Sequence, residues 1–171
     1  MKKIIFTFFL FSLATFSNSN QDKYIIKDFN INKYLGTWFE IVRKENIFEK
    51  DLDFVTATYS LNSDGNINVL NKGFNITKNK ESQITGKAKK KYENIENILE
   101  VSFFGPFYSD YIIADYDKEN YNWALVLGKN SNYMWILSRK PQLDEEIRNS
   151  ILNKAVSFGI ELTDLVYVKQ E

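Results

Sequence analysis

The sequence predicts an all-β fold: an eight-stranded antiparallel up-and-down β-barrel, with one C-terminal α-helix packed outside it and a short final strand. Two observations carry this prediction. Eight short runs rich in β-branched and aromatic residues are separated by polar turns, which is typical of a barrel or a sandwich. A single stretch with helical spacing follows the last of these runs. Short connections favour a meander that closes on itself.

The eight predicted strands span residues 37–43, 54–61, 67–74, 83–89, 98–104, 111–117, 121–127 and 133–138. Gly65, in the turn at 63–66, can adopt the positive φ that a tight hairpin requires. The polar segment at 128–132 suits another hairpin. These turns indicate antiparallel pairing between consecutive strands.

The helical pattern begins after Pro141, where Asp144, Glu145 and Glu146 place negative charge at a helix N-terminus. Apolar residues then recur at helical spacing and form one stripe: Leu143, Ile147, Ile151, Ala155 and Phe158. Gly159 is expected to end the helix. An eight-stranded barrel is too narrow to hold a helix, so the stripe should pack outside it. The run at 165–168 predicts a short strand that pairs near the first.

The chain has 171 residues, and its start is typical of a secretory signal peptide. Two lysines precede an apolar run at 4–16, which is too short for a membrane-spanning helix, and small polar residues follow. We therefore expect a signal peptide at 1–19 and a single domain at 20–171. The product is expected to be exported to the periplasm or to the outside of the cell.

The composition argues against several classes of function. The chain contains no His and no Cys, which removes the usual near-neutral base, the thiol nucleophile and most zinc sites. No metal site and no cofactor are predicted. The 22 basic and 22 acidic residues balance, so there is no electrostatic reason to expect nucleic-acid binding.

Five motifs occur in order along the predicted domain: YLGTWFEI at 34–41, TATYSL at 56–61, VLNKG at 69–73, VSFFGPF at 101–107 and YMWILSR at 133–139. In these motifs the sequence resembles the lipocalin family, most closely its bacterial outer-membrane members, over about residues 29–169. The resemblance implies the closed barrel and a carrier of small apolar ligands. One departure is that Asp117 precedes Tyr121 by one residue more than the family's pattern, which predicts a lengthened hairpin.

Members of that bacterial branch are often anchored to the membrane through a cysteine at the cleavage site. This chain has no cysteine, so we expect a soluble export product, with association to the outer membrane as the alternative.

Gly36, Trp38 and Arg139 are expected to close one end of the barrel. A Trp on the first strand can fill the tapered end, and an Arg after the last barrel strand can lay its guanidinium over the ring. Gly36 lets the preceding segment approach closely, because a side chain there would collide. These three residues form a floor and are not expected to touch a ligand.

The residues that line the barrel follow from strand alternation anchored on Trp38 and from the family resemblance. The expected ligand-binding residues are Val42, Val55, Ala57, Tyr59, Val69, Asn71, Ala88, Val101, Phe103, Tyr111, Ile113, Ala124, Val126, Tyr133 and Trp135. Several inward positions are small, at Ala57, Gly86, Ala88 and Ala124, which argues for a cavity. An apolar lining with a few hydroxyl and amide groups suits an amphiphile. The resemblance implies a fatty acid or a lysophospholipid, used in envelope maintenance.

Two other classes of function stay open. An interaction protein would use the barrel as a scaffold, with the mouth loops and the aromatic segment 103–108 binding another protein. The same aromatic segment is a candidate surface for forming a homodimer or for contacting a membrane peripherally. An enzyme would have to use the carboxylates of Glu40 and Asp115, both expected to face inward, although a structural role for them is favoured. Ile47, Phe48 and Leu52, in the loop at 44–53, form either a lid or a local core under the loop.

Overall fold

The structure is a computed structural model that describes residues 21–171, so the predicted signal peptide at 1–19 lies outside the described residues. The strands are β1 (Gly36–Lys44), β2 (Leu52–Leu61), β3 (Ile67–Asn75), β4 (Lys80–Tyr92), β5 (Ile95–Phe104), β6 (Phe107–Tyr116), β7 (Trp123–Leu127), β8 (Met134–Ser138) and β9 (Leu165–Tyr167). The helices are α1 (Ile31–Tyr34) and α2 (Glu145–Ser157), and a 3-10 turn, η1 (Asp22–Tyr24), precedes them.

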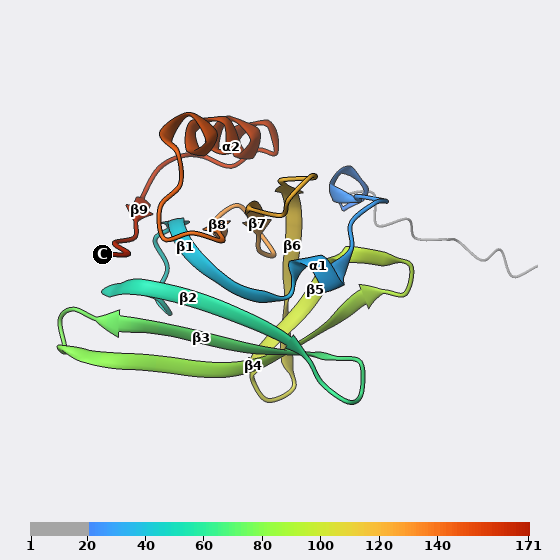
Figure 1. The fold of residues 1–171 in the computed structure, drawn as a ribbon, viewed down its shortest axis with the longest axis horizontal. Coiled ribbons are helices and arrows are strands. Elements are labelled where there is room, and N and C mark those ends of the chain that lie inside the picture. Colours follow the sequence, from blue (N-terminus) through green and yellow to red (C-terminus); the bar gives the residue numbers. More distant parts are fainter. Residues whose placement is uncertain (1–20) are drawn as a thin grey trace, which may run out of the picture.

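Strands β1 to β8 form a closed antiparallel barrel (Figure 1). Each strand pairs with the next along the chain, and β8 pairs with β1 to close the circle. The short strand β9 adds to β1. In Figure 1, β2, β3 and β4 form one wall, and α2 lies on the opposite side of the barrel. The predicted fold class is therefore confirmed.

The central strands are longer than the sequence predicts. β4 runs from Lys80 to Tyr92, whereas the prediction covered only 83–89. Along this strand, exposed Lys87 and Lys89 alternate with buried Ala88, so few apolar residues identify it as a strand. A strand with one face in water keeps polar residues there, and hydrophobicity alone then underestimates its length.

Two separate hydrophobic clusters hold the barrel. One fills its closed end around Trp38, Tyr34 and Phe29. The other lies between the outer face of the barrel and α2, and it contains Ile136 and Ile151. Inward side chains of the strands belong to the first cluster, and outward side chains of the strands next to α2 belong to the second.

Helix α2 begins with Asp144, whose side chain accepts hydrogen bonds from the backbone N–H groups of Glu146 and Ile147 at 2.9 and 3.1 Å. Its buried residues are Ile151, Leu152 and Ala155. The predicted stripe is wrong at Ile147, which is 40% exposed because the buried face is centred one turn further along the helix. Among the described residues, no helix is both long enough and apolar enough to cross a membrane.

Candidate functional site

The closed end of the barrel is built around Trp38, whose side chain is fully buried. The guanidinium carbon of Arg139 lies 3.8 Å from the centre of the Trp38 ring. Arg139 also donates hydrogen bonds to the carbonyls of Leu35, Lys33 and Thr37 at 2.8, 2.9 and 3.0 Å. Gly36 has a φ of +97°, and a Cβ there would lie 3.3 Å from Arg139 Nη1. Arg139 thus joins the last barrel strand to the segment that precedes the first.

Directly above this floor, three tyrosine hydroxyls meet inside the barrel. Tyr111 Oη lies 2.6 Å from the Oη of Tyr34 and 2.6 Å from that of Tyr59. Burial raises the pKa of the Tyr111 hydroxyl well above its usual range, and the two neighbouring tyrosines raise it further. The pKa values of Tyr34 and Tyr59 are raised as well, so all three hydroxyls stay neutral at physiological pH and form a polar group on the inner wall.

Most of the predicted lining residues face the barrel interior. The interior cluster contains eight of them, all buried: Ala57, Tyr59, Val69, Ala88, Val101, Ile113, Ala124 and Val126. Phe103, Tyr111 and Trp135 are only partly buried and pack against this cluster. Val55 is buried close to Gly73.

Asn71 and Tyr133 also lie on the inner wall. Asn71 is half-buried between its strand partners Ala57 and Ile84, and its Oδ1 atom is buried without a hydrogen-bond partner. The Tyr133 ring stacks on Trp135, with ring centres 6.1 Å apart and planes inclined by 23°.

The wall is sealed at the floor and accessible toward the other end. Trp38, Tyr34 and Ala124 are fully buried, whereas Phe103, Tyr133 and Trp135 face inward and keep solvent-accessible surface. Part of the space that small residues were expected to leave is occupied. A Cβ on Gly86 would lie 2.7 Å from the ring of Phe103, so this ring covers the position.

The prediction that Val42 faces inward is wrong. Strand β1 contains a bulge between Glu40 and Val42 in its pairing with β8, and Val42 belongs to the cluster beneath α2. Because a bulge adds one residue to a strand, every later side chain points to the opposite face from that expected by alternation. Arg43 enters the interior in place of Val42.

The expected inward orientation of Asp115 is also wrong. Strand β6 has a bulge between Ile113 and Asp115, and Asp115 pairs with Leu125, which belongs to the outer cluster. The Asp115 carboxylate accepts a hydrogen bond from the N–H of Tyr116 at 3.0 Å. It is separated from Glu40, so the pair of inward carboxylates does not form.

Glu40 does face inward, and it lies in a buried charged cluster. Arg43 Nη1 donates to Glu40 Oε1 at 2.8 Å, and the Arg43 and Glu40 side chains are 4% and 5% exposed. Arg43 Nη2 donates to the carbonyls of Glu49 and Leu52 at 2.8 and 3.1 Å. Burial raises the pKa of the Glu40 carboxyl well above its usual range, and the neighbouring Glu49 carboxyl raises it further.

Glu49 comes from the loop between β1 and β2 and reaches the inner wall. Its Oε2 atom accepts a hydrogen bond from Trp135 Nε1 at 2.9 Å and one from Asn46 Nδ2 at 2.7 Å. Neither Arg43 nor Glu49 was predicted from the sequence to face the barrel interior. The bulge displaced Arg43 from the expected alternation, and a glutamate in a charged loop gives no sign that it folds inward.

The same loop exposes two apolar side chains. Ile47 is 82% exposed and Phe48 is 65% exposed, whereas Leu52 is half-buried. Asn46 Oδ1 accepts hydrogen bonds from the N–H groups of Phe48 and Glu49, both at 3.1 Å, which holds the turn in this conformation. Ile47 and Phe48 therefore do not fold beneath the loop as a local core.

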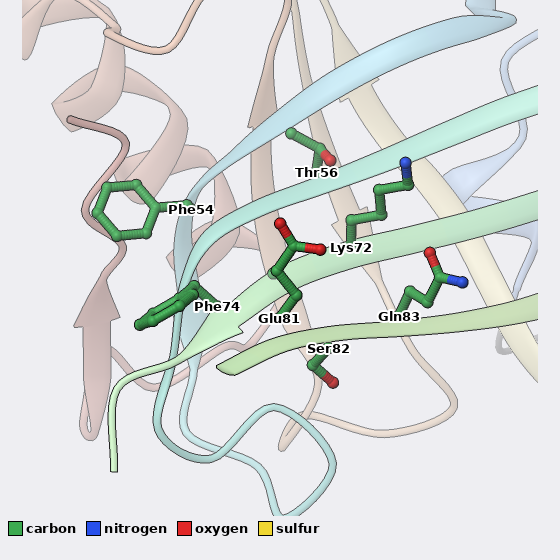
Figure 2. Close-up of a pocket in the computed structure, with 8 residues that line it drawn as sticks. Phe54, Thr56, Lys72, Phe74, Glu81, Ser82 and Gln83 are labelled. Atoms are coloured by element: carbon green, nitrogen blue, oxygen red, sulfur yellow. The ribbon is translucent and has the colours of Figure 1, made fainter. Parts of the chain in front are cut away.

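A shallow hollow of about 780 Å³ lies on the outer side of the β2–β3–β4 wall (Figure 2). In Figure 2, Thr56, Lys72 and Gln83 extend from one face of these strands, while Ser82 points to the other. None of the predicted ligand-binding residues lines it. Within residues 21–171, no group of three or more His, Cys, Asp or Glu side chains is placed to hold a metal ion.

Comparison with known proteins agrees with this geometry. Residues 29–170 match the model of the lipocalin-like domain. The chain is 39% identical to the outer membrane lipoprotein Blc of Vibrio cholerae, over 85% of each chain. It is 44% identical to the protein of the same name from Citrobacter freundii, over 85% of this chain and 82% of that one. Apolipoprotein D of Mus musculus is 34% identical, over 84% of this chain and 78% of its own.

Among solved structures, lobster apocrustacyanin A1 matches with a TM-score of 0.67 at 19% identity, over 83% of this chain and 80% of that one. This likeness supports the barrel fold. The resemblance inferred from the five motifs is confirmed, and this chain belongs to the lipocalin family.

Proposed function

We propose that this protein binds one small amphiphilic lipid, a fatty acid or a lysophospholipid, inside the barrel and transports or stores it in the cell envelope. One observation carries the proposal: the interior is sealed at the Trp38 end, while inward-facing Phe103, Tyr133 and Trp135 keep accessible surface toward the other end. A ligand would have to enter at the end opposite Trp38. Lipocalins are generally binding proteins, which supports the same reading.

The lining suits an acyl chain. Burying methylene groups contributes about 0.8 kcal/mol each, so a typical acyl chain contributes on the order of 10 kcal/mol before the costs of association. The expected contacts are the inward-facing residues described above, without Val42. Asn71 Oδ1 is buried without a partner and can accept a hydrogen bond from a ligand hydroxyl or amine.

The location is inferred from the relatives, which are named outer membrane lipoproteins. These names support export to the envelope. We propose that residues 1–19 act as the signal peptide and that the protein functions in the periplasm or outside the cell, free or associated with the outer membrane.

The proposal is tested by native mass spectrometry of gently purified protein, with extraction of any lipid that it carries. We expect a single bound amphiphile per chain. We also expect palmitate or lysophosphatidylcholine to quench tryptophan fluorescence saturably, since Trp135 lies on the inner wall. A protein that carries no lipid and shows no quenching with either compound would contradict the proposal.

A second candidate function, a non-catalytic interaction module, rests on the hairpin between β5 and β6. Phe104 and Phe107 are 62% and 78% exposed, and Tyr108 lies beside them. This aromatic patch would support a homodimer or peripheral contact with a membrane. Size-exclusion chromatography with light scattering and vesicle flotation of Phe107→Ser distinguish these roles from ligand binding. No catalytic role is proposed, because Glu40 is engaged by Arg43 and Asp115 faces away.

A further inference from the structure

We propose, building on the proposed function, that the barrel selects amphiphiles with a cationic head group over those with a free carboxylate. The head-group site is the inner-wall cluster of Glu40, Glu49, Trp135 and Tyr133. If the barrel binds no amphiphile at all, both proposals fail. If it binds amphiphiles without regard to head-group charge, only this one fails.

The inner wall carries more acidic than basic groups in this cluster. The cluster contains two carboxyl groups, from Glu40 and Glu49, and one guanidinium, from Arg43. The donors of Arg43 are already used by Glu40 and by two backbone carbonyls. With both carboxyls ionised, the cluster carries one uncompensated negative charge in a place where burial makes charge costly.

Within residues 21–171, no Lys or Arg side chain other than Arg43 forms an ion pair with Glu40 or Glu49. Lys44, next to Arg43 on β1, turns the other way and donates to the carbonyls of Glu161 and Thr163 at 2.8 and 3.0 Å. Lys72 on β3 extends from the outer wall (Figure 2). On β2, Asp53 accepts a hydrogen bond from the Lys169 N–H, and Tyr59 is a neutral phenol. Among the described residues, Arg43 is the only buried cation that contacts both Glu40 and Glu49. It pairs with the Glu40 carboxylate and donates to the backbone carbonyl of Glu49.

Burial and the adjacent Glu49 carboxyl raise the pKa of the Glu40 carboxyl well above its usual range, which favours the form that keeps its proton. A ligand cation that enters the cluster replaces this proton: the Glu40 proton leaves to solvent, and the ligand's positive charge balances the second carboxylate. A ligand carboxylate would instead add a third acidic group.

The aromatic groups of the cluster point to the same class of ligand. Trp135 and Tyr133 are stacked on the inner wall and are half-buried, so ring surface is available beside the Glu49 carboxyl. A cation placed over an indole or phenol face gains about 0.5–2 kcal/mol, and carboxylates gain nothing there.

The test compares three amphiphiles of equal chain length by isothermal titration calorimetry near neutral pH. They are dodecyltrimethylammonium, dodecanoate and the neutral monododecanoylglycerol. We expect the cation to bind about tenfold more tightly than the carboxylate, with the neutral compound between them. We also expect cation binding to release protons, measured as a dependence of the heat on the ionisation enthalpy of the buffer.

Glu49→Gln and its matched control Glu45→Gln separate a local site from overall charge. Both remove one negative charge from the same loop, but Glu45 is exposed. Glu49→Gln is expected to reduce the cation preference to about threefold or less, and Glu45→Gln to leave it unchanged. The glutamine can still accept the hydrogen bond from Trp135, so the loop should keep its conformation, which near-ultraviolet circular dichroism checks.

Two results would overturn this inference while leaving the proposed function intact. One is dodecanoate binding at least as tightly as dodecyltrimethylammonium. The other is an equal effect of Glu49→Gln and Glu45→Gln. The absence of binding by all three compounds would overturn both proposals.

Discussion

The two ends of the inner wall solve the problem of buried charge in different ways. At the floor, one half-buried cation, Arg139, is engaged by the Trp38 face and by backbone carbonyls. Further along, Glu40 and Glu49 outnumber their single cation, Arg43. The floor is complete without a ligand, whereas the second cluster has two carboxyl groups for one guanidinium. We therefore assign closure of the barrel end and recognition of the ligand head group to different residues.

The largest expected effect is at the floor. Arg139→Ala removes a guanidinium that bridges residues distant in sequence and leaves several backbone carbonyls without this donor, so we expect a loss of about 3 kcal/mol in the free energy of unfolding. Urea denaturation measures this loss. Lipid affinity, measured under native conditions, should be nearly unchanged. A large loss of affinity with little loss of stability would mean that floor and binding site have been exchanged.

The next largest effect on stability is expected at Gly36, the glycine of the floor. Gly36→Ala combines a positive φ with a contact 3.3 Å from Arg139, so we expect a loss of about 2 kcal/mol. Gly65→Ala is the matched control, because Gly65 has a φ of +76° and open space around it. It should cost about 1 kcal/mol from backbone strain alone. Equal losses, compared by thermal denaturation, would remove Arg139 from the explanation.

At the other end, Trp135→Ala should act on binding more than on folding. Trp135 is half-buried, faces inward and donates to Glu49, so its removal takes away both a contact surface and the anchor of the loop. We expect lipid affinity to fall about tenfold, equivalent to about 1.4 kcal/mol. The stability loss should be smaller than that of Arg139→Ala. Calorimetric titration beside a denaturation curve makes the comparison, and unchanged affinity would contradict it.

The smallest effect is a dependence of stability on pH. The pKa of Glu40 is raised in the folded protein, so the folded state holds a proton that the unfolded state releases above its ordinary pKa of 4.5. The contribution of this group is therefore fully present below that value and is lost as the pH rises through the folded-state pKa.

Glu40→Gln should flatten this slope by at least about 1 kcal/mol between mildly acidic and mildly alkaline pH. Urea denaturation across that range compares the variant with the wild type. If the stability of the variant falls with pH as steeply as that of the wild type, a group other than Glu40 causes the slope.

The sequence contained enough to predict the barrel and its floor but only part of the binding wall. Trp38 and Arg139 lie in motifs where the chain resembles its family, and the eight strands follow from alternation and turns. Alternation then fails after each bulge, which is why Val42 and Asp115 were misplaced. A bulge is a feature of backbone pairing that leaves no residue-type pattern in these two strands.

The charged cluster could not have been predicted for a related reason. Glu49 reaches the inner wall only because Asn46 holds the loop in a turn and Trp135 offers a donor from a strand distant in sequence. Contacts between a loop and a remote strand depend on the closed barrel. They cannot be derived from local sequence.

The most direct test of a ligand inside the barrel uses a lipid whose acyl chain carries bromine near the head group, because bromine quenches tryptophan fluorescence only at close range. Trp135 lies on the inner wall, and Trp123 packs in the outer cluster. We expect tryptophan fluorescence to be quenched saturably by one equivalent of lipid. This quenching should be retained in Trp123→Phe and largely lost in Trp135→Phe. Quenching that is lost in Trp123→Phe and retained in Trp135→Phe would place the lipid outside the barrel and contradict the account.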